Sequence, residues 1–253
     1  MFVEERQNLI VEELEENGKV LVKDLSKRFD VTCDLIRKDL NALEKKGKCK
    51  KIYGGAILNR ENVHLLNANS RKSVHVEKKM ELAKLAYDVI KDDTIVFLDI
   101  STTNIELAKL IVSNNKKLTV VTNMLDIAQI LANSTVSTIF IGGQFDKGRN
   151  GFVGNLTDDF IQRFHFDLAF LGVVGLDIEK NSVMTYMADD GQTKRVILNQ
   201  TKEAFMICES EKFYQSGNYE YAKIDDFYGI ITDKDSKGLK NYNVEVIKTN
   251  KKQ

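Results

Sequence analysis

The chain has 253 residues, 37 basic and 37 acidic side chains, and 43% hydrophobic residues. This length suits one large domain or two unequal ones. No segment approaches the roughly 20 apolar residues that a membrane span requires, and the acidic N-terminus is unlike a signal peptide, so we expect a cytoplasmic protein with no membrane partner. The widely spaced Cys33, Cys49 and Cys208 form no CxxC pair, which favours reduced thiols over a disulfide or a metal site.

The zero net charge is distributed unevenly along the chain. Residues 1–16 carry six acidic side chains and one basic one, whereas residues 37–51 carry seven basic side chains against Asp39 and Glu44. A basic run alone usually marks a solvated face. Here the run coincides with a pattern of helices and turns that is typical of DNA-binding domains.

The first 57 residues predict three helices and a hairpin. Apolar positions at Leu9, Ile10 and Leu14 indicate an amphipathic helix over 3–16 that ends at Asn17-Gly18, and a short β-prone stretch follows at 20–22. We expect a second helix over 23–29, a tight turn at 30–31, and a third helix capped by Thr32 and ended by Gly47. A strand over 48–53 and a return strand over 56–58 complete a winged helix-turn-helix domain, assigned to residues 1–57.

The third helix has the pattern of a recognition helix. Leu35, Ile36 and Leu40 are expected to pack inward, while Asp39 caps locally or orients a neighbouring basic side chain. Arg37 can reach a guanine edge in the major groove, and Lys38 suits a phosphate. The predicted DNA-binding residues are Thr32, Cys33, Asp34, Arg37 and Lys38 on the helix, and Lys48, Lys50 and Lys51 on the wing. An exposed amphipathic helix in a protein-interaction module is the alternative.

Residues 58–76 are polar and weakly periodic, so we predict a linker there and a second domain over 77–253. In that domain, apolar runs recur at 94–98, 118–121, 136–141, 167–173, 204–207, 228–231 and 245–247. Helical patterns occupy 77–91, 103–112, 125–132, 157–163 and 192–202. Nearly continuous apolar runs separated by helices predict an α/β domain with a mostly parallel sheet covered on both faces.

The end of the 94–98 run is the first candidate ligand site. Asp99 follows the strand directly, and Ser101, Thr102 and Thr103 open the next helix. Ligands of open α/β sheets lie at the carboxyl ends of the strands, and the free amides of a helix N-terminus attract phosphate. The three hydroxyl residues could equally be an ordinary helix cap, and Asp99 could bind sugar hydroxyls or cap a turn.

Small polar residues and glycines follow other predicted strands. Glycine permits close approach of the backbone to a ligand, although each such position could be an ordinary turn. Two lysines could add positive charge, although most lysines are solvated. The additional effector candidates are Thr122, Asn123, Gly142, Gly143, Gly172, Lys194 and Lys212.

The N-terminal segment resembles the DNA-binding domain of the DeoR family of bacterial regulators. Residues 36–44 read IRKDLNALE and residues 54–56 read GGA, which match that family's (I/L)RxDLxxLE and GGA elements over nearly 55 residues. The cysteines Cys33 and Cys49 are unexpected within this pattern.

The C-terminal segment resembles the sensor domain of the same family. Residues 99–103 (DISTT), 121–123 (VTN), 142–143 (GG), 170–175 (FLGVVG), 190–194 (DGQTK), 209–213 (ESEKF) and 231–233 (ITD) follow the family's elements in order. The resemblance implies a fold related to ribose-phosphate isomerases and a phosphorylated-sugar effector seated on Ser101, Thr102 and Thr103. Asp190 replaces the usual glutamate, Glu209 the usual aspartate, and Glu211 a small hydroxyl residue, which puts the identity of the effector in question.

These observations predict a DNA-binding repressor of a carbohydrate-metabolism operon that responds to a phosphorylated sugar. We expect double-stranded operator DNA as partner, a homodimer or homotetramer, no metal and no cofactor other than the effector. The alternative is a sugar-phosphate isomerase or deaminase with an added N-terminal module, in which Asp99, Glu209 or Glu211 would act as general base. A metal-sensing repressor is disfavoured because no His/Cys cluster has ligand spacing.

Overall fold

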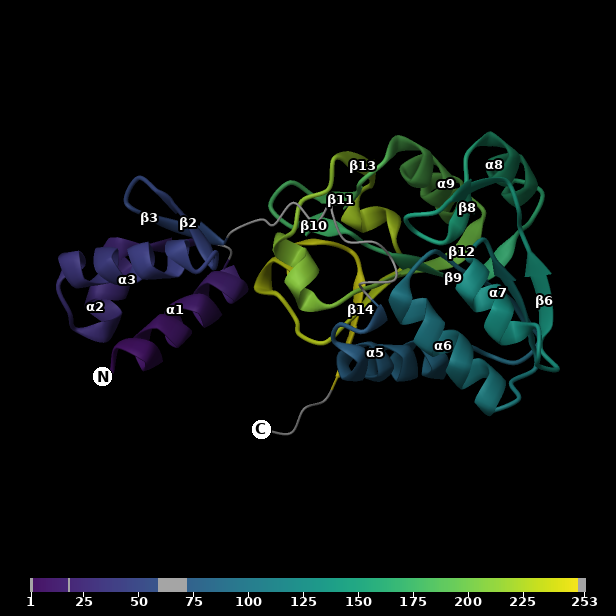
Figure 1. The fold of residues 1–253 in the computed structure, drawn as a ribbon, viewed down its shortest axis with the longest axis horizontal. Coiled ribbons are helices and arrows are strands. Elements are labelled where there is room, and N and C mark those ends of the chain that lie inside the picture. Colours follow the sequence, from purple (N-terminus) through teal and green to yellow (C-terminus); the bar gives the residue numbers. More distant parts are fainter. Residues whose placement is uncertain (1, 18, 59–71, 250–253) are drawn as a thin grey trace. The chain divides into compact units, whose positions relative to one another are not determined.

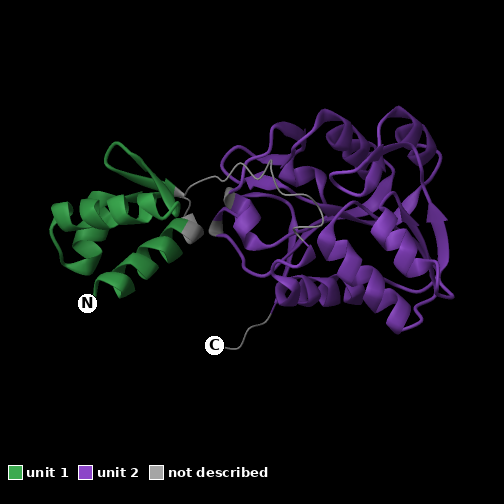
Figure 2. Cartoon of the chain, viewed as in Figure 1, with its two compact units in different colours: residues 1–61 green, residues 62–253 purple. Residues whose placement is uncertain are grey.

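The computed structural model describes residues 2–17, 19–58 and 72–249 (Figure 1). The chain divides into two compact units, residues 1–61 and residues 62–253 (Figure 2). We call them the head and the sensor and describe each by itself. The predicted linker, 58–76, falls largely on residues 59–71, which lie outside the described residues; its two ends, Leu58 and Val76, belong to a strand and a helix.

The head is a three-helix domain with a small antiparallel sheet. Its helices are α1 (Val3–Asn17), α2 (Val22–Phe29) and α3 (Cys33–Lys45), and its strands are β1 (Lys19–Leu21), β2 (Cys49–Ile52) and β3 (Gly55–Leu58). The hairpin β2–β3 forms as predicted, and β1 pairs with β3 as a third strand. The second helix begins at Val22, one residue before the predicted start.

Side chains from all three helices form the core of the head. Ile10, Leu14, Leu25, Ile36 and Leu40 are buried together. Leu35, which was expected to pack inward, is only half-buried because it occupies the flank of α3 next to its exposed first turn. Thr32 caps α3 as predicted, its Oγ1 accepting a hydrogen bond from the Leu35 amide at 3.3 Å.

The sensor is built on a seven-stranded, fully parallel sheet. The strand order is β15-β14-β12-β9-β4-β5-β6. The strands are β4 (Thr94–Leu98), β5 (Leu118–Thr122), β6 (Ser137–Phe140), β9 (Phe166–Gly172), β12 (Thr201–Ile207), β14 (Gly229–Thr232) and β15 (Glu245–Lys248). Each corresponds to one of the seven apolar runs of the sequence.

Helices cover both faces of this sheet, which explains why the strands lack an alternating pattern. Val96 and Leu98 pack in one apolar cluster with α5 (Val76–Val89), α6 (Thr102–Ser113) and α7 (Leu125–Leu131). Phe97, between them, packs in the opposite cluster with α8 (Asn155–Ile161) and α9 (Ala188–Asn199). Helix α6 contacts both α5 and α7, so it is the middle helix of its layer (Figure 1).

Several short elements were not predicted. A hairpin of β7 (Gln144–Asp146) and β8 (Gly151–Val153) follows β6, and β10 (Gly175–Asp177), β11 (Ser182–Thr185) and β13 (Tyr219–Ala222) form a separate antiparallel sheet. Short 3-10 helices span Ser210–Tyr214, Ile224–Asp226 and Lys237–Asn241. The predicted bounds of the helix over 192–202 were wrong. Helix α9 starts earlier, at Ala188, and it ends at Asn199 because Thr201 already begins β12. None of the helices in the described parts of the chain could span a membrane.

Candidate DNA interface and effector site

The first turns of α3 present polar side chains to solvent. Thr32, Asp34, Arg37 and Lys38 are exposed, and Cys33 is half-buried. The Arg37 guanidinium donates to Asp34 Oδ1 at 2.6 Å, with Arg37 60% exposed. This exposed pair leaves the guanidinium accessible, and the contact of Asp34 and Arg37 with DNA stays a prediction.

The wing carries three of the predicted phosphate-binding lysines. Lys48 and Lys50 are exposed. Lys51 is also exposed but is tied to α3, since its amide donates to Glu44 Oε1 at 2.8 Å and its ammonium donates to Asn41 Oδ1. Tyr53, at the tip of the wing, is fully exposed. Tyr53 is not among the predicted DNA-binding residues, although an aromatic residue directly before Gly54-Gly55 marks a hairpin tip.

Asp39 supports the recognition helix from inside the head. Its Oδ2 accepts a hydrogen bond from Arg6 Nε at 2.6 Å, and its Oδ1 accepts one from Gln7 Nε2 at 3.2 Å. All three residues are buried. Asp39 therefore orients a basic side chain, as expected, and that side chain comes from α1.

Some of the predicted effector residues lie where the strand order of the sheet reverses. From β4 the chain continues outward to β5 and β6, then returns to β9 on the other side of β4 and continues to β12, β14 and β15. The loops after β4 and β9 therefore diverge. We call the region between them the candidate effector crevice, because ligands of open α/β sheets usually bind at such a reversal point. Asp99 and Ser101 follow β4, and Gly172 ends β9.

Asp99 and Lys194 form a buried ion pair at this reversal point. Lys194 Nζ donates to Asp99 Oδ2, which also accepts a hydrogen bond from the Gly172 amide at 3.0 Å. Asp190 Oδ1 lies 4.0 Å from the same ammonium, and Thr185 Oγ1 donates to Asp190 Oδ2. Burial raises the pKa of the Asp99 carboxyl, opposed by Lys194, while the charge of Asp190 adds to the rise. Lys194 lies in the middle of α9, whereas the predicted helix over 192–202 would place it near the start.

Several polar atoms around this pair have no hydrogen-bond partner among the described residues. They are Asp99 Oδ1, Asn104 Oδ1 and the hydroxyl of Tyr221, all on side chains that are 1% exposed or less. Burial, with the nearby charges of Asp99 and Asp190, raises the pKa of Tyr221. Asn104 and Tyr221 were not predicted, because no local sequence pattern distinguishes a tyrosine in the hydrophobic core from one beside a polar cluster.

The three hydroxyl residues open α6 as predicted. Ser101 is the N-cap, and its Oγ accepts a hydrogen bond from the Thr103 amide at 3.2 Å. Thr102 and Thr103 are 8% and 5% exposed. A Cβ at Gly172 would lie 2.8 Å from Ser101 Cβ, so only glycine allows the loop after β9 to pack against this cap. The structure thus brings Asp99, the α6 cap, Gly172 and Lys194 together.

Four other predicted residues have structural partners. Thr122 Oγ1 donates to Leu98 O at 2.7 Å, and Asn123 Nδ2 donates to Phe152 O at 2.8 Å. Asn123 Oδ1 is buried and has no partner within residues 2–17, 19–58 and 72–249. Gly142 O accepts from Thr157 Oγ1 at 3.0 Å. A Cβ at Gly143 would lie 2.0 Å from that hydroxyl oxygen. These contacts brace the loops after β5 and β6.

Lys212 and Glu211 lie in the 3-10 helix after β12. Lys212 Nζ donates to Gln215 Oε1 at 2.7 Å. Glu211 Oε1 accepts from Lys78 Nζ at 2.7 Å, and its Oε2 lies 3.4 Å from His75 Nδ1. The extra acid is therefore engaged by α5 residues, which reduces its repulsion of an anionic ligand.

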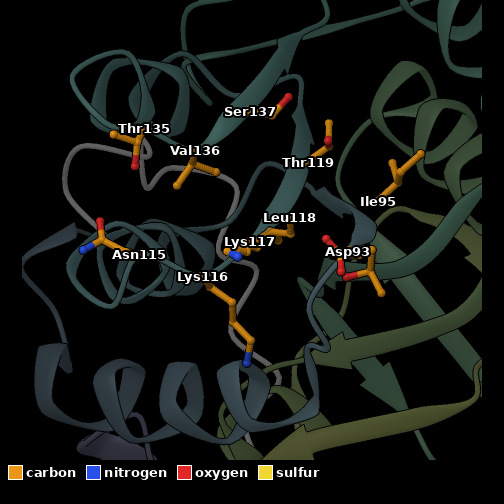
Figure 3. A pocket seen from close by; sticks show the side chains of 11 residues that line it. Asp93, Ile95, Asn115, Lys116, Lys117, Leu118, Thr119, Thr135, Val136 and Ser137 are labelled. Atoms are coloured by element: carbon orange, nitrogen blue, oxygen red, sulfur yellow. The ribbon is translucent and has the colours of Figure 1, made fainter.

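A surface pocket of about 450 Å³ lies at the opposite edge of the sheet (Figure 3). It is lined by residues at the amino ends of β4, β5 and β6, among them Asp93, Lys116, Lys117, Thr119 and Ser137. Lys116 Nζ is bound to Tyr87 O at 3.2 Å and lies over the Tyr87 ring. None of the predicted effector residues lines this pocket.

A winged helix-turn-helix head joined to an α/β sensor defines a ligand-responsive DNA-binding transcriptional regulator. The chain matches the DeoR-like helix-turn-helix domain over residues 6–62 and the DeoR C terminal sensor domain over residues 74–234. It belongs to the DeoR family, which confirms the resemblance seen in the sequence. The chain is therefore a regulator and not the isomerase or deaminase considered as the alternative.

Named regulators are similar over most of their length. The chain is 32% identical to the HTH-type transcriptional regulator GolR of Listeria innocua, covering 84% of this chain and 83% of that protein. It is 28% identical to the glycerol-3-phosphate regulon repressor of Escherichia coli, covering 90% of both. Among solved structures, ribose 5-phosphate isomerase A of Methanocaldococcus jannaschii matches with a TM-score of 0.40 and 11% identity, over 53% of this chain and 52% of that one.

Proposed function

We propose that the protein represses a carbohydrate-metabolism operon and that a phosphorylated sugar binds the sensor at the crevice between the loops after β4 and β9. Relatives named as repressors, among them the glycerol-3-phosphate regulon repressor of Escherichia coli and the HTH-type transcriptional repressor GlcR of Bacillus subtilis, support this direction of control. The protein would act in the cytoplasm on operator DNA and need no cofactor beyond the effector.

The observation that carries the effector proposal is the buried cluster at the reversal point of the sheet. A phosphate on the α6 cap would meet the helix dipole and the hydroxyls of Ser101, Thr102 and Thr103. Asp99 Oδ1, buried and without a hydrogen-bond partner in the described parts of the chain, is an acceptor for a sugar hydroxyl, and Lys194 lies beside it. A ligand with an anionic end and a hydroxyl-bearing end matches this arrangement.

Control of DNA binding follows if the effector favours one arrangement of paired heads. Two heads in a homodimer or homotetramer would read two half-sites, and a preference of a few kcal/mol for one arrangement is enough to change occupancy. Tight operator binding in the absence of effector and release in its presence is the behaviour of an induced repressor.

The test is a shift assay on the DNA upstream of the protein's own gene, with inorganic phosphate, a panel of sugar phosphates and the corresponding free sugars. We expect sequence-specific binding that a subset of the phosphorylated compounds weakens and that the free sugars do not change. Specific binding that no phosphorylated compound alters would refute the effector class and leave the DNA-binding role intact.

A further inference from the structure

The segment that leads from the linker into α5 is anchored to the sensor at three points. Lys72 Nζ donates to Asp126 Oδ1 on α7 at 2.6 Å. His75 Nδ1 is paired with Glu209 Oε2 at 2.7 Å, after the end of β12. Lys78 Nζ donates to Glu211 Oε1 at 2.7 Å in the same loop. We name residues 72–78 the strap.

The anchors lie on opposite sides of the candidate effector crevice. Asp126 follows β5, whereas Glu209 and Glu211 follow β12, and β9 and β4 lie between these two strands. Three strand spacings amount to about 14 Å. The backbone from Lys72 to His75 spans at most about 11 Å. Even with the length of the Lys72 side chain added, this segment can join the two anchors only by crossing the loops after β4 and β9.

The same conclusion follows from the helix layer. Helix α6 is the middle helix between α5 and α7. The strap joins the first turn of α7 to the start of α5, and both helices begin at the carboxyl edge of the sheet. Its path therefore passes the N-terminal turn of α6, where Thr102 and Thr103 are buried.

The strap is held by charge and by backbone geometry. His75 adopts φ 51° and ψ 39°, a left-handed conformation that is uncommon outside glycine, asparagine and aspartate. Lys79 Nζ donates to Val74 O at 2.6 Å. Partial burial opposes the charged form of Lys78, but the hydrogen bond and attraction of Glu211, with Asp233 and Glu209 beyond it, outweigh burial and raise the pKa of Lys78.

The two acidic anchors after β12 join segments that are far apart in the chain. Glu209 pairs with His75 and Glu211 with Lys78, and these partners lie 134 and 133 residues earlier. Both carboxylates are therefore engaged by side chains at the start of α5.

We infer that the strap closes the effector site and that effector binding releases it, which passes the signal toward residues 59–71 and the head. This inference rests on the proposed function. A phosphate arriving at the α6 cap would attract Lys72 away from Asp126, and it would need the space that the strap crosses. A metal ion held by His75, Glu209 and Glu211 is the competing use of the cluster, but Lys78 already occupies one of these carboxylates.

The variants are Lys72→Gln, Glu211→Gln and their combination. Lys109→Gln is the matched control, because Lys109 makes an ion pair of the same kind with Glu106 on α6, at 2.8 Å. Hydrogen exchange of residues 72–78 should become about two- to fivefold faster for each lost anchor, the range that partly exposed ion pairs give. If hydrogen exchange of residues 72–78 in these variants is as slow as in Lys109→Gln, the ion pairs do not hold the strap and the inference is overturned.

Operator affinity tests the coupling without any effector. Each variant should bind the operator about two- to fivefold more weakly than the control does. Glu211→Gln is the decisive variant because two explanations predict opposite results for it. Loss of a negative charge alone would strengthen binding to the anionic DNA, whereas loss of the strap's anchor should weaken it. Faster exchange with operator affinity equal to that of Lys109→Gln would overturn the signalling role.

Ligand experiments separate this inference from the proposed function. Inorganic phosphate and glucose 6-phosphate are titrated into the full-length wild type by calorimetry, followed by hydrogen exchange of the complex. Binding that speeds exchange of residues 72–78 supports the inference, and binding that leaves the strap protected overturns it. If neither compound nor any other sugar phosphate binds, the effector proposal fails. The exchange and operator measurements on the variants still decide whether the strap controls DNA binding.

Zn²⁺ binding that Glu211→Gln abolishes would assign the cluster of His75, Glu209 and Glu211 to a metal ion instead.

Discussion

Arg6 Nε lies 2.6 Å from Asp39 Oδ2, and both side chains are 4% exposed. A buried ion pair therefore links α1 to the recognition helix α3. Removing one partner of such a pair leaves an uncompensated charge in the core. Asp39→Ala should therefore lower the free energy of unfolding of the head by about 3 kcal/mol. Thermal unfolding of the full chain, with hydrogen exchange in α1 and α3 to identify the head, measures this.

The control is Asp34→Ala, which breaks the exposed pair with Arg37 on the same helix. Exposed pairs contribute about 0–1 kcal/mol. Equal losses for the two variants would show that burial does not distinguish the two ion pairs.

Arg37 is the predicted base-reading residue of α3, and its exposed guanidinium is paired with Asp34. Arg37→Ala should weaken operator binding by about 1–3 kcal/mol and relax base preference at one position, because a bidentate contact to guanine is lost. Competition binding with cognate and single-substituted operators measures both effects. A variant with unaltered base preference and wild-type affinity would show that Arg37 does not contact the bases.

Lys50 on the wing is exposed and suited to a phosphate. Lys50→Ala should weaken binding to all sequences alike and reduce the slope of log affinity against log salt by about one, since one fewer counterion is released. Lys180→Ala in the sensor is the control, because Lys180 is 76% exposed and lies outside the head. A slope equal to that of the control would exclude a phosphate contact by Lys50.

The strands and the recognition helix were predictable because each is encoded by neighbouring residues. Seven apolar runs gave the seven strands of the sheet, and Thr32 and Ser101 capped the expected helices. Contacts between distant residues were not predictable in this way. The pairing of His75 with Glu209 joins residues 134 positions apart, and no local pattern indicates it.

The candidate site shows the same division. Asp99 and the α6 cap follow from the rule that ligands bind beyond the carboxyl ends of strands, and the sheet order places them at the reversal point. The neighbouring Asn104 and Tyr221 were missed, since burial beside a charge depends on tertiary packing. Thr122 and Gly143 carry sequence marks of a ligand site, yet their observed contacts brace loops.

The three cysteines should differ in reactivity. Burial, with the charge of Glu44, raises the pKa of Cys49 to about 11, and burial raises that of Cys208 to about 12. Thiolate is the reactive form, so both should resist alkylation at neutral pH. Cys33 is half-buried in the first turn of α3 and should react first with iodoacetamide.

Operator DNA should slow alkylation of Cys33, because the first turn of a recognition helix enters the major groove. The measurement is the rate of modification by mass spectrometry with operator, with scrambled DNA and without DNA. Equal rates in all three would place this turn outside the groove.

Thr102→Val tests the phosphate seat directly. The substitution keeps the shape of the side chain but removes the hydroxyl at the first position of α6. The variant should bind operator as the wild type does. Its response to the effector should be at least about tenfold weaker, a loss that corresponds to one hydrogen bond to a charged group. The response is measured as the effector concentration that halves operator binding. Thr94→Val is the matched control, because Thr94 lies at the amino end of β4 and its hydroxyl donates to Lys91 O at 2.7 Å. Since Thr94 begins β4 and Thr102 lies just beyond its carboxyl end, a weakened response confined to Thr102→Val would locate the anion at the carboxyl edge of the sheet. Equal responses in the two variants would exclude the α6 cap as the phosphate site.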